Sequence, residues 1–175
     1  MRILWIYFNL IFWTLLFGLG SFFTILITGK KKNFKFFGII WGKTLSFIFN
    51  VKLVTKGKEK LQNKNFIFAA NHASLIDIPL LLVAVERYTV FIAKNELSKI
   101  PIFNSILKKA GFIFVDRKNN DSAVRSMNYL LEDIKKTPRS VGIFPEGTRT
   151  KMATFCSLKK EQLFLGLIQK YLLFQ

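Results

Sequence analysis

The 175-residue chain has room for one domain of ordinary size, which excludes a second full domain beside it. It carries 27 Lys and Arg residues against 10 Asp and Glu, for a formal net charge of +17, yet 51% of its residues are hydrophobic and 20 are Phe. This combination calls for an anionic partner with an apolar part, and it disfavours a nucleic-acid binder. The single cysteine, Cys156, excludes an internal disulfide and gives no indication of a zinc site.

The first 50 residues are predicted to form a membrane anchor. No charged residue occurs from Ile3 to Thr28, and at about 1.5 Å per residue this run is long enough to cross a hydrocarbon core of roughly 30 Å. It predicts a transmembrane helix or a hairpin-like insertion. A cleaved signal peptide is the alternative, but the run is longer than the apolar region of such peptides and ends in no clear cleavage site.

The residues after this run indicate which side of the membrane the remainder occupies. Four lysines lie between Lys30 and Lys35, and positive charge after a span favours a cytoplasmic catalytic portion. The next segment, Phe34 to Phe49, is rich in aromatic and aliphatic residues and contains only two lysines. It fits an interfacial helix in the headgroup region or an ordinary buried helix, and both alternatives stay open.

After Asn50, short apolar runs alternate with polar or amphipathic segments, which predicts alternating strands and helices. The expected strands are Val51–Thr55, Phe66–Ala70, Thr89–Ala93, Ile113–Val115 and Val141–Phe144. The expected helices are Ile78–Val85, Ile102–Ala110 and Ser122–Lys136, the last with Ser122 as its cap and with Val124, Met127, Leu131 and Ile134 on one face. This order predicts an α/β domain over residues 51–150, with a mixed sheet flanked by helices.

Three of the expected strands are followed at once by polar side chains of catalytic types. These are Asn71, His72, Ser74 and Asp77 after the first, Asp116 and Arg117 after the second, and Glu146, Gly147, Thr148 and Arg149 after the third. In open α/β sheets, ligands bind beyond the carboxyl ends of the strands. If these strands are parallel neighbours, the three loops converge on one site.

The first loop holds the only histidine of the chain, His72, five positions before Asp77. In a regular helix this spacing separates two side chains by about 140°, so a pair between them requires a turn. Pro79 is tolerated in a first helical turn, which places the helix start near Asp77 and His72 in the loop before it. A His–Asp pair makes a general base, because the carboxylate fixes the tautomer of the imidazole. The alternative is structural, with Asp77 as an N-cap or with Ser74 and Asp77 as a capping box.

The third loop is suited to an anion. Gly147 permits a close backbone approach, Thr148 offers a hydroxyl donor, and Arg149 presents a planar fork that holds a phosphate through two bonds. Arg117 in the second loop supplies a further cation. For either loop taken singly, the alternative is a surface turn with ordinary solvated arginines.

Together, the three segments resemble the ordered motifs of the acyltransferase superfamily that includes bacterial lysophosphatidate (1-acyl-sn-glycerol-3-phosphate) acyltransferases. Asn71–Asp77 is similar to the first motif, a histidine and an aspartate separated by four residues. Gly111–Arg117 resembles the second motif and Phe144–Arg149 the third, and their order and spacing agree with the family pattern. The similarity extends from about Val51 to Thr150.

The resemblance implies that His72 deprotonates the free hydroxyl of a lysophosphatidate, which attacks the thioester of acyl-CoA or acyl-carrier protein, while Asp77 orients the histidine. The implied phosphate-binding residues are Arg117, Thr148 and Arg149, with Glu146 and Gly147 shaping the third loop. The resemblance implies no covalent acyl-enzyme, no cofactor and no metal, and its partners are membrane lipids rather than nucleic acid. Transfer to glycerol-3-phosphate or another lysolipid, and an inactive membrane-bound remnant, stay open as alternatives.

Residues 151–175 depart from the family pattern. A fourth motif, with a proline followed by valine after a Phe-Lys-Lys-Gly-like stretch, is not intact there. We therefore expect a carboxyl end that is truncated or altered by a shift of reading frame. Permitted codons for Phe155 to Gln162 and for Tyr171 to Gln175 can be chosen so that another frame encodes both missing features, and the nucleotide sequence tests this hypothesis. A product that lacked an interior strand would expose apolar surface and unpaired backbone groups.

Overall fold

The computed structural model describes residues 1–61, 65–116 and 120–144. In chain order, these form α1 (Arg2–Thr28), α2 (Phe34–Ile48), β1 (Ile67–Ala69), α3 (Asp77–Val85), β2 (Thr89–Lys94), α4 (Pro101–Lys109), β3 (Ile113–Val115), α5 (Asn120–Lys136) and β4 (Ser140–Ile143). Short 3-10 helices lie at Lys31–Asn33, Lys58–Lys60 and Asn95–Lys99.

The four described strands form one sheet in the order β1-β4-β2-β3. Helices connect consecutive strands along the chain, which returns each strand to the same end of the sheet, so that the strands run in parallel. The predicted α/β class with flanking helices is confirmed. The sheet was expected to be mixed, whereas every pairing among the described strands is parallel.

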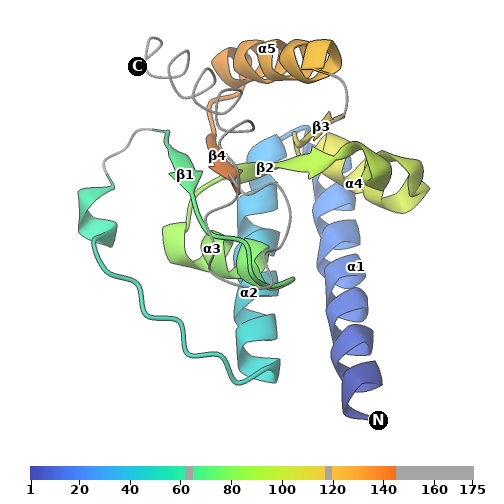
Figure 1. Ribbon diagram of the computed structural model, residues 1–175, viewed down its shortest axis with the longest axis vertical. Coiled ribbons are helices and arrows are strands. Elements are labelled where there is room, and N and C mark those ends of the chain that lie inside the picture. The colour runs from blue at the N-terminus through green and yellow to red at the C-terminus, as the bar shows by residue number, and fades with distance from the viewer. Residues whose placement is uncertain (62–64, 117–119, 145–175) are drawn as a thin grey trace.

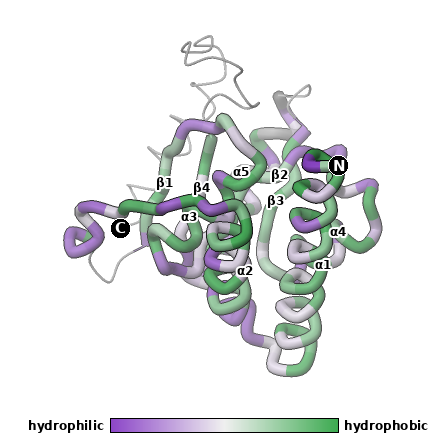
Figure 2. Tube along the Cα trace, turned by 90° about the horizontal axis from the view of Figure 1, so that it is seen from below, coloured by the Kyte–Doolittle hydropathy of each residue, from purple (hydrophilic) through white to green (hydrophobic). Residues whose placement is uncertain are grey.

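Two antiparallel helices precede the α/β domain and lie side by side (Figure 1). Gly29 ends α1 in the left-handed region, at φ 68°, and donates its N–H to the carbonyl of Ile25, so the chain can turn back into α2. Hydrophobic residues predominate along both helices (Figure 2). The helical prediction for the apolar run is confirmed, and α1 is the one described helix whose length and composition suffice to cross a membrane.

Helix α2 also packs closely on α3, and glycine makes this approach possible. A Cβ added at Gly42 would collide with the carbonyl oxygen of Pro79, and one added at Gly38 would lie 2.9 Å from Cδ1 of Leu82. Helices whose contact residues lack side chains can bring their backbones together. The first residue of α3 is Asp77, so the contact with α2 helps to position this residue.

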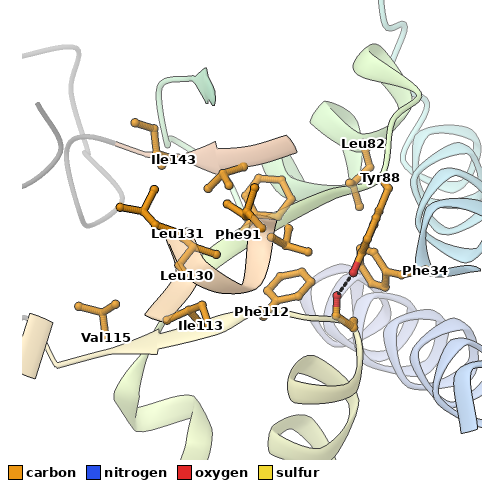
Figure 3. Close-up of a cluster of buried hydrophobic side chains, with 14 of the residues drawn as sticks. Phe34, Leu82, Tyr88, Phe91, Phe112, Ile113, Val115, Leu130, Leu131 and Ile143 are labelled. Atoms are coloured by element: carbon orange, nitrogen blue, oxygen red, sulfur yellow. Dashed lines mark hydrogen bonds between the residues drawn. The ribbon is translucent and has the colours of Figure 1, made fainter. Parts of the chain in front are cut away.

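The core lies between the sheet and its helices, where side chains from α2, α3 and α5 meet those of the strands (Figure 3). Phe91 of β2 is 3% exposed and contacts Phe112, whose ring in turn meets Phe34 of α2 edge to face. The buried hydroxyl of Tyr88 donates a 2.9 Å hydrogen bond to the carbonyl of Ala110. Burial raises the pKa of Tyr88 to about 12, because a phenolate would lose its hydration there.

A charged cluster ties the end of α1 to α5. Arg139, whose side chain is fully buried, donates to Oδ2 of Asp133 at 2.5 Å and to the carbonyl oxygens of Thr137 and Gly111. Lys31 lies 3.4 Å from the other oxygen of Asp133. Burial opposes ionisation of Asp133, but the hydrogen bond and charge of Arg139, together with Lys31, outweigh it and lower the pKa of this carboxyl.

Two local predictions are wrong. The expected strand Val51–Thr55 has no regular secondary structure, since no described strand pairs with it, and Val54 is 66% exposed. Helix α5 begins at Asn120, so Ser122 lies within its first turn rather than at its cap. Val124 on the predicted apolar face is 45% exposed, because the helix buries Leu130, Leu131 and Ile134 farther along.

Candidate active site

His72 and Asp77 meet in the loop that joins β1 to α3. Nδ1 of His72 lies 2.9 Å from Oδ2 of Asp77, and the two side chains are 19% and 21% exposed. The same oxygen accepts the backbone N–H groups of Ala73 at 2.8 Å and Ser74 at 2.7 Å. An ionised carboxylate only accepts hydrogen bonds, so Nδ1 carries the proton and Nε2 is the basic nitrogen of the ring.

This geometry agrees with the predicted contact across a turn and differs from the alternative of Asp77 as an N-cap. It includes one half of the capping-box alternative, because Asp77 accepts the backbone N–H of Ser74. The N-cap position of α3 is held by Ile76, which makes no side-chain capping bond, and Asp77 is the first helical residue. The carboxylate reaches backward to the loop instead of capping the helix. Pro79 lies in the first helical turn, as expected.

The imidazole stacks on an aromatic side chain from a distant part of the sequence. The ring centroids of His72 and Phe144 are 4.3 Å apart, with an angle of 24° between the planes. Phe144 stacks in turn on Phe91, at 5.7 Å and 8°. The sheet order explains this arrangement, because β4 lies between β1 and β2 and so brings the residue after its end beside both. The sequence pattern gave no signal for this contact.

A cavity of about 390 Å³ lies beside the His72 ring. Its walls come from α1, α2, α4, the end of β2 and the β1–α3 loop, and they include Leu15, Phe17, Gly18, Phe37, Trp41, Leu75, Phe103 and Ile106. Within the described part of the chain, His72 and Lys94 are the ionisable residues that line it. The cavity is therefore an apolar space with a basic imidazole at its wall, which suits a ligand with a hydrocarbon part.

Five of the predicted site residues lie outside the described residues: Arg117, Glu146, Gly147, Thr148 and Arg149. The structure does describe β3, which precedes Arg117, and β4, which precedes the other four residues. β1 and β4, which precede the first and third loops, are neighbours, whereas β2 separates β4 from β3, which precedes the second loop. All three strands are parallel, so their carboxyl ends share one edge of the sheet.

Sequence reasoning missed the second source of site residues, the amino-terminal helices. The anchor segment and the α/β domain were treated as separate parts, yet α1 and α2 supply a large share of the cavity wall. Lys94 was missed as well, although it follows the apolar run of β2 directly. In residues 1–61, 65–116 and 120–144, no three His, Cys, Asp or Glu side chains gather closely enough to hold a metal ion.

Fold and site together define a class, that of α/β domains with a hydrogen-bonded His–Asp pair beside an apolar cavity. The sequence model of the acyltransferase family matches residues 52–166. The chain therefore belongs to the acyltransferase family.

Individual relatives agree with this assignment. A 1-acyl-sn-glycerol-3-phosphate acyltransferase of Cocos nucifera is 33% identical over 131 residues, which cover 75% of this chain and 42% of the relative. One of Saccharomyces cerevisiae is 35% identical over 119 residues, which cover 67% of this chain and 39% of the relative. The chain thus spans about two fifths of the length of these two curated relatives.

A solved structure supports the fold assignment. The crystal structure of the 1-acyl-sn-glycerophosphate (LPA) acyltransferase PlsC from Thermotoga maritima matches with a TM-score of 0.70 and 28% sequence identity. The match covers 95% of this chain and 70% of that chain. It includes most of the amino-terminal helices, so the likeness extends beyond the α/β domain.

Proposed function

We propose that this protein transfers a fatty acyl group from acyl-CoA or acyl-carrier protein to the free hydroxyl of 1-acylglycerol-3-phosphate, which gives phosphatidate. The observation that carries the proposal is the His72–Asp77 pair at the wall of a 390 Å³ apolar cavity. The printed names of the relatives and of the solved structure support the choice of acceptor.

In this mechanism Nε2 of His72 removes the proton of the acceptor hydroxyl as its oxygen attacks the thioester carbonyl. The tetrahedral intermediate then collapses, the carbon–sulfur bond breaks, and the thiolate takes the proton from the imidazolium. Asp77 holds the Nδ1–H throughout, because the 2.9 Å contact fixes the tautomer that leaves Nε2 basic. Acyl transfer occurs directly between the two substrates, and Ser74 forms no acyl-enzyme.

The cavity provides the place for an acyl chain. Its lining is almost wholly apolar, so burial of each CH₂ group there contributes about 0.8 kcal/mol relative to water. Arg117, Thr148 and Arg149 are proposed to bind the phosphate of the acceptor, with Glu146 and Gly147 shaping that loop. The proposal assigns no cofactor and no metal to the reaction.

We also propose that α1 and α2 hold the protein at a membrane, with the α/β domain on the cytoplasmic side. Residues Ile3, Leu4, Phe8 and Ile11 of α1 are 56–74% exposed, which is unusual for an apolar helix in water. Because α1 also lines the cavity, a lipid substrate can reach the site without leaving the bilayer surface.

The test is phosphatidate formation by membranes that contain this chain, with lysophosphatidate and a radiolabelled acyl thioester as substrates. His72→Ala is expected to lower the rate by about 10²–10⁴-fold, the usual contribution of a positioned general base. Lys136→Ala, an exposed change at the end of α5, is the matched control and should retain the rate.

Two outcomes would contradict the proposal. Equal rates for the parent chain and His72→Ala at equal membrane content would exclude the assigned base. Acylation of glycerol-3-phosphate in place of lysophosphatidate would contradict the proposed acceptor, although the proposed acyl-transfer chemistry would stand.

A further inference from the structure

We propose that Phe144 is a positioning residue for the His72 base, and that its ring sets the plane in which the imidazole lies. This inference rests on the proposed function for its kinetic consequence and on the geometry of the stack for its structural part. In the sequence, Phe144 opens the third motif. Thr148 and Arg149 of this motif are proposed to bind the phosphate of the acceptor, and Glu146 and Gly147 are proposed to shape the loop. No role had been assigned to Phe144 itself.

Asp77 and Phe144 restrain the imidazole in different ways. The hydrogen bond at Nδ1 fixes the position of that atom but does not by itself fix the tilt of the ring about the line that joins the two residues. The position of Nε2 depends on this tilt, because Nε2 lies on the far side of the ring. A contact with the face of the ring restrains the tilt and so helps to aim Nε2 at a hydroxyl.

Phe144 supplies this restraint through its face. The centroid separation of 4.3 Å and the 24° interplanar angle describe two stacked rings. Both rings line the cavity, so a tilt of the imidazole would either separate the faces or press the Phe144 ring away. The hydrogen bond thus holds one edge of the imidazole, and the stack holds its plane.

Phe144 can act in this way because it is itself supported by the core. Phe91, which is 3% exposed, stacks on Phe144 at 5.7 Å and 8°, and Phe91 contacts Phe112 in turn (Figure 3). The backbone of Gly142 provides the space for Phe91, since a Cβ there would collide with the Phe91 ring. The imidazole is therefore joined to the core through a series of aromatic contacts that runs from Phe112 through Phe91 and Phe144.

The kinetic test compares three variants of the full chain in membranes. Phe144→Leu keeps apolar bulk but removes the flat face, and kcat is expected to fall about tenfold to a hundredfold with little change in KM, because a displaced base affects the transition state. Phe144→Tyr keeps the ring and should restore most of kcat. Phe47→Leu makes the same chemical change at an 87% exposed position of α2, away from the cavity, and should leave kcat unchanged.

The spectroscopic test needs no activity. His72 is the only histidine, so the chain labelled with ¹³C,¹⁵N-histidine, purified in detergent through a histidine-free tag, gives one imidazole spectrum. The stack predicts ring protons shifted upfield by the aromatic current and nuclear Overhauser contacts to a phenylalanine ring. In Phe144→Leu the upfield shift should disappear, and in Phe144→Tyr it should remain.

These measurements separate the two proposals. If even the parent chain forms no phosphatidate, the proposed function fails while the imidazole spectrum still decides whether the stack exists. The positioning role is overturned if the parent spectrum lacks the upfield shift and the ring contacts, which requires no folded variant. It is also overturned if Phe144→Leu retains full kcat in an active enzyme.

Discussion

Asp77 accepts three hydrogen bonds on one carboxylate oxygen, from the imidazole of His72 and from two backbone N–H groups of the loop. The loop conformation and the histidine orientation therefore depend on the same charge. A carboxylate with several N–H partners is a strong acceptor, and removal of its charge would loosen the turn as well as the imidazole. At this site, the residue that holds the imidazole also shapes the loop that carries His72.

A second residue of this kind, Asp133, stabilises the fold instead of the site. Asp133→Asn removes the anionic partner of the buried Arg139, and we expect a loss of about 3 kcal/mol in the free energy of unfolding at neutral pH. Thermal denaturation of the detergent-solubilised chain, followed by circular dichroism, measures this loss. Glu132→Gln, next to it on an exposed surface pair with Lys135, is the matched control and should not change the melting temperature.

The pH dependence of the same variant has a definite sign. The pKa of Asp133 is lower in the folded chain than its ordinary value, so its stabilising effect is fully present above about pH 4 and is lost as the pH falls through the folded-state pKa. The stability difference between parent and Asp133→Asn should therefore shrink in acid. A difference that stayed constant from pH 7 to pH 3 would contradict the proposed ion pair.

At the scale of elements, the contact between α2 and α3 connects the amino-terminal helices to the site. Gly38 and Gly42 lie one turn apart on α2 and allow it to approach the start of α3. α3 begins with Asp77, so the depth of this contact determines where the carboxylate lies relative to β1. The helix that was predicted as an interfacial helix or an ordinary buried helix is thus also a structural support of the His–Asp pair, and it buries Phe34, Gly38, Gly42 and Leu45.

Gly42→Ala tests this connection. The added methyl group would meet the carbonyl oxygen of Pro79 in the α3 backbone, so the helices must separate, at a cost of about 1–3 kcal/mol in the free energy of unfolding. We expect a lower melting temperature and a lower rate of phosphatidate formation. Lys43→Ala, the exposed neighbour on α2, should change neither. Parent-like melting and activity in Gly42→Ala would show that the helices tolerate a larger separation.

At the scale of the whole molecule, α1 has two different faces. One face supplies cavity-lining residues such as Leu15 and Gly18, and buries Ser21 and Ile25. Another carries exposed apolar side chains along almost the full length of the helix, including Leu4, Phe8, Ile11, Leu19 and Phe23. A helix of this kind can lie against lipid on one side and against an acyl-chain site on the other.

Charges introduced on the exposed face should weaken membrane attachment. With Leu4, Phe8 and Ile11 all changed to Glu, insertion becomes less favourable by about 2.5–3.5 kcal/mol for each charge that must enter the hydrocarbon layer. The fraction of chain that sediments with phosphatidylcholine vesicles should fall sharply. Lys136→Glu on α5 replaces a positive charge by a negative one away from this face and should leave the sedimenting fraction unchanged. Undiminished sedimentation of the triple variant would exclude α1 as the attachment surface.

Local features of the chain were readable from the sequence. The amphipathic and apolar periodicities placed the helices from α1 to α5 and the strands from β1 to β4 within about two residues, because these patterns depend on backbone geometry over one or two turns. The five-residue spacing of His72 and Asp77, together with Pro79, likewise predicted a turn between them. The prediction failed at Val51–Thr55, where an apolar run resembles a strand but no partner strand is present in the described chain.

Strand order, and everything that depends on it, was decided by the tertiary structure. The placement of β4 between β1 and β2 puts Phe144 against His72, although 71 residues separate the two positions, and no periodicity encodes that neighbour relation. The apolar cavity likewise exists only where α1, α2 and α4 meet the sheet. The sequence by itself determined which segments are regular and supplied the candidate side chains for the chemistry, since those properties are local. Their mutual placement arose from long-range packing, in which each contact depends on all the others.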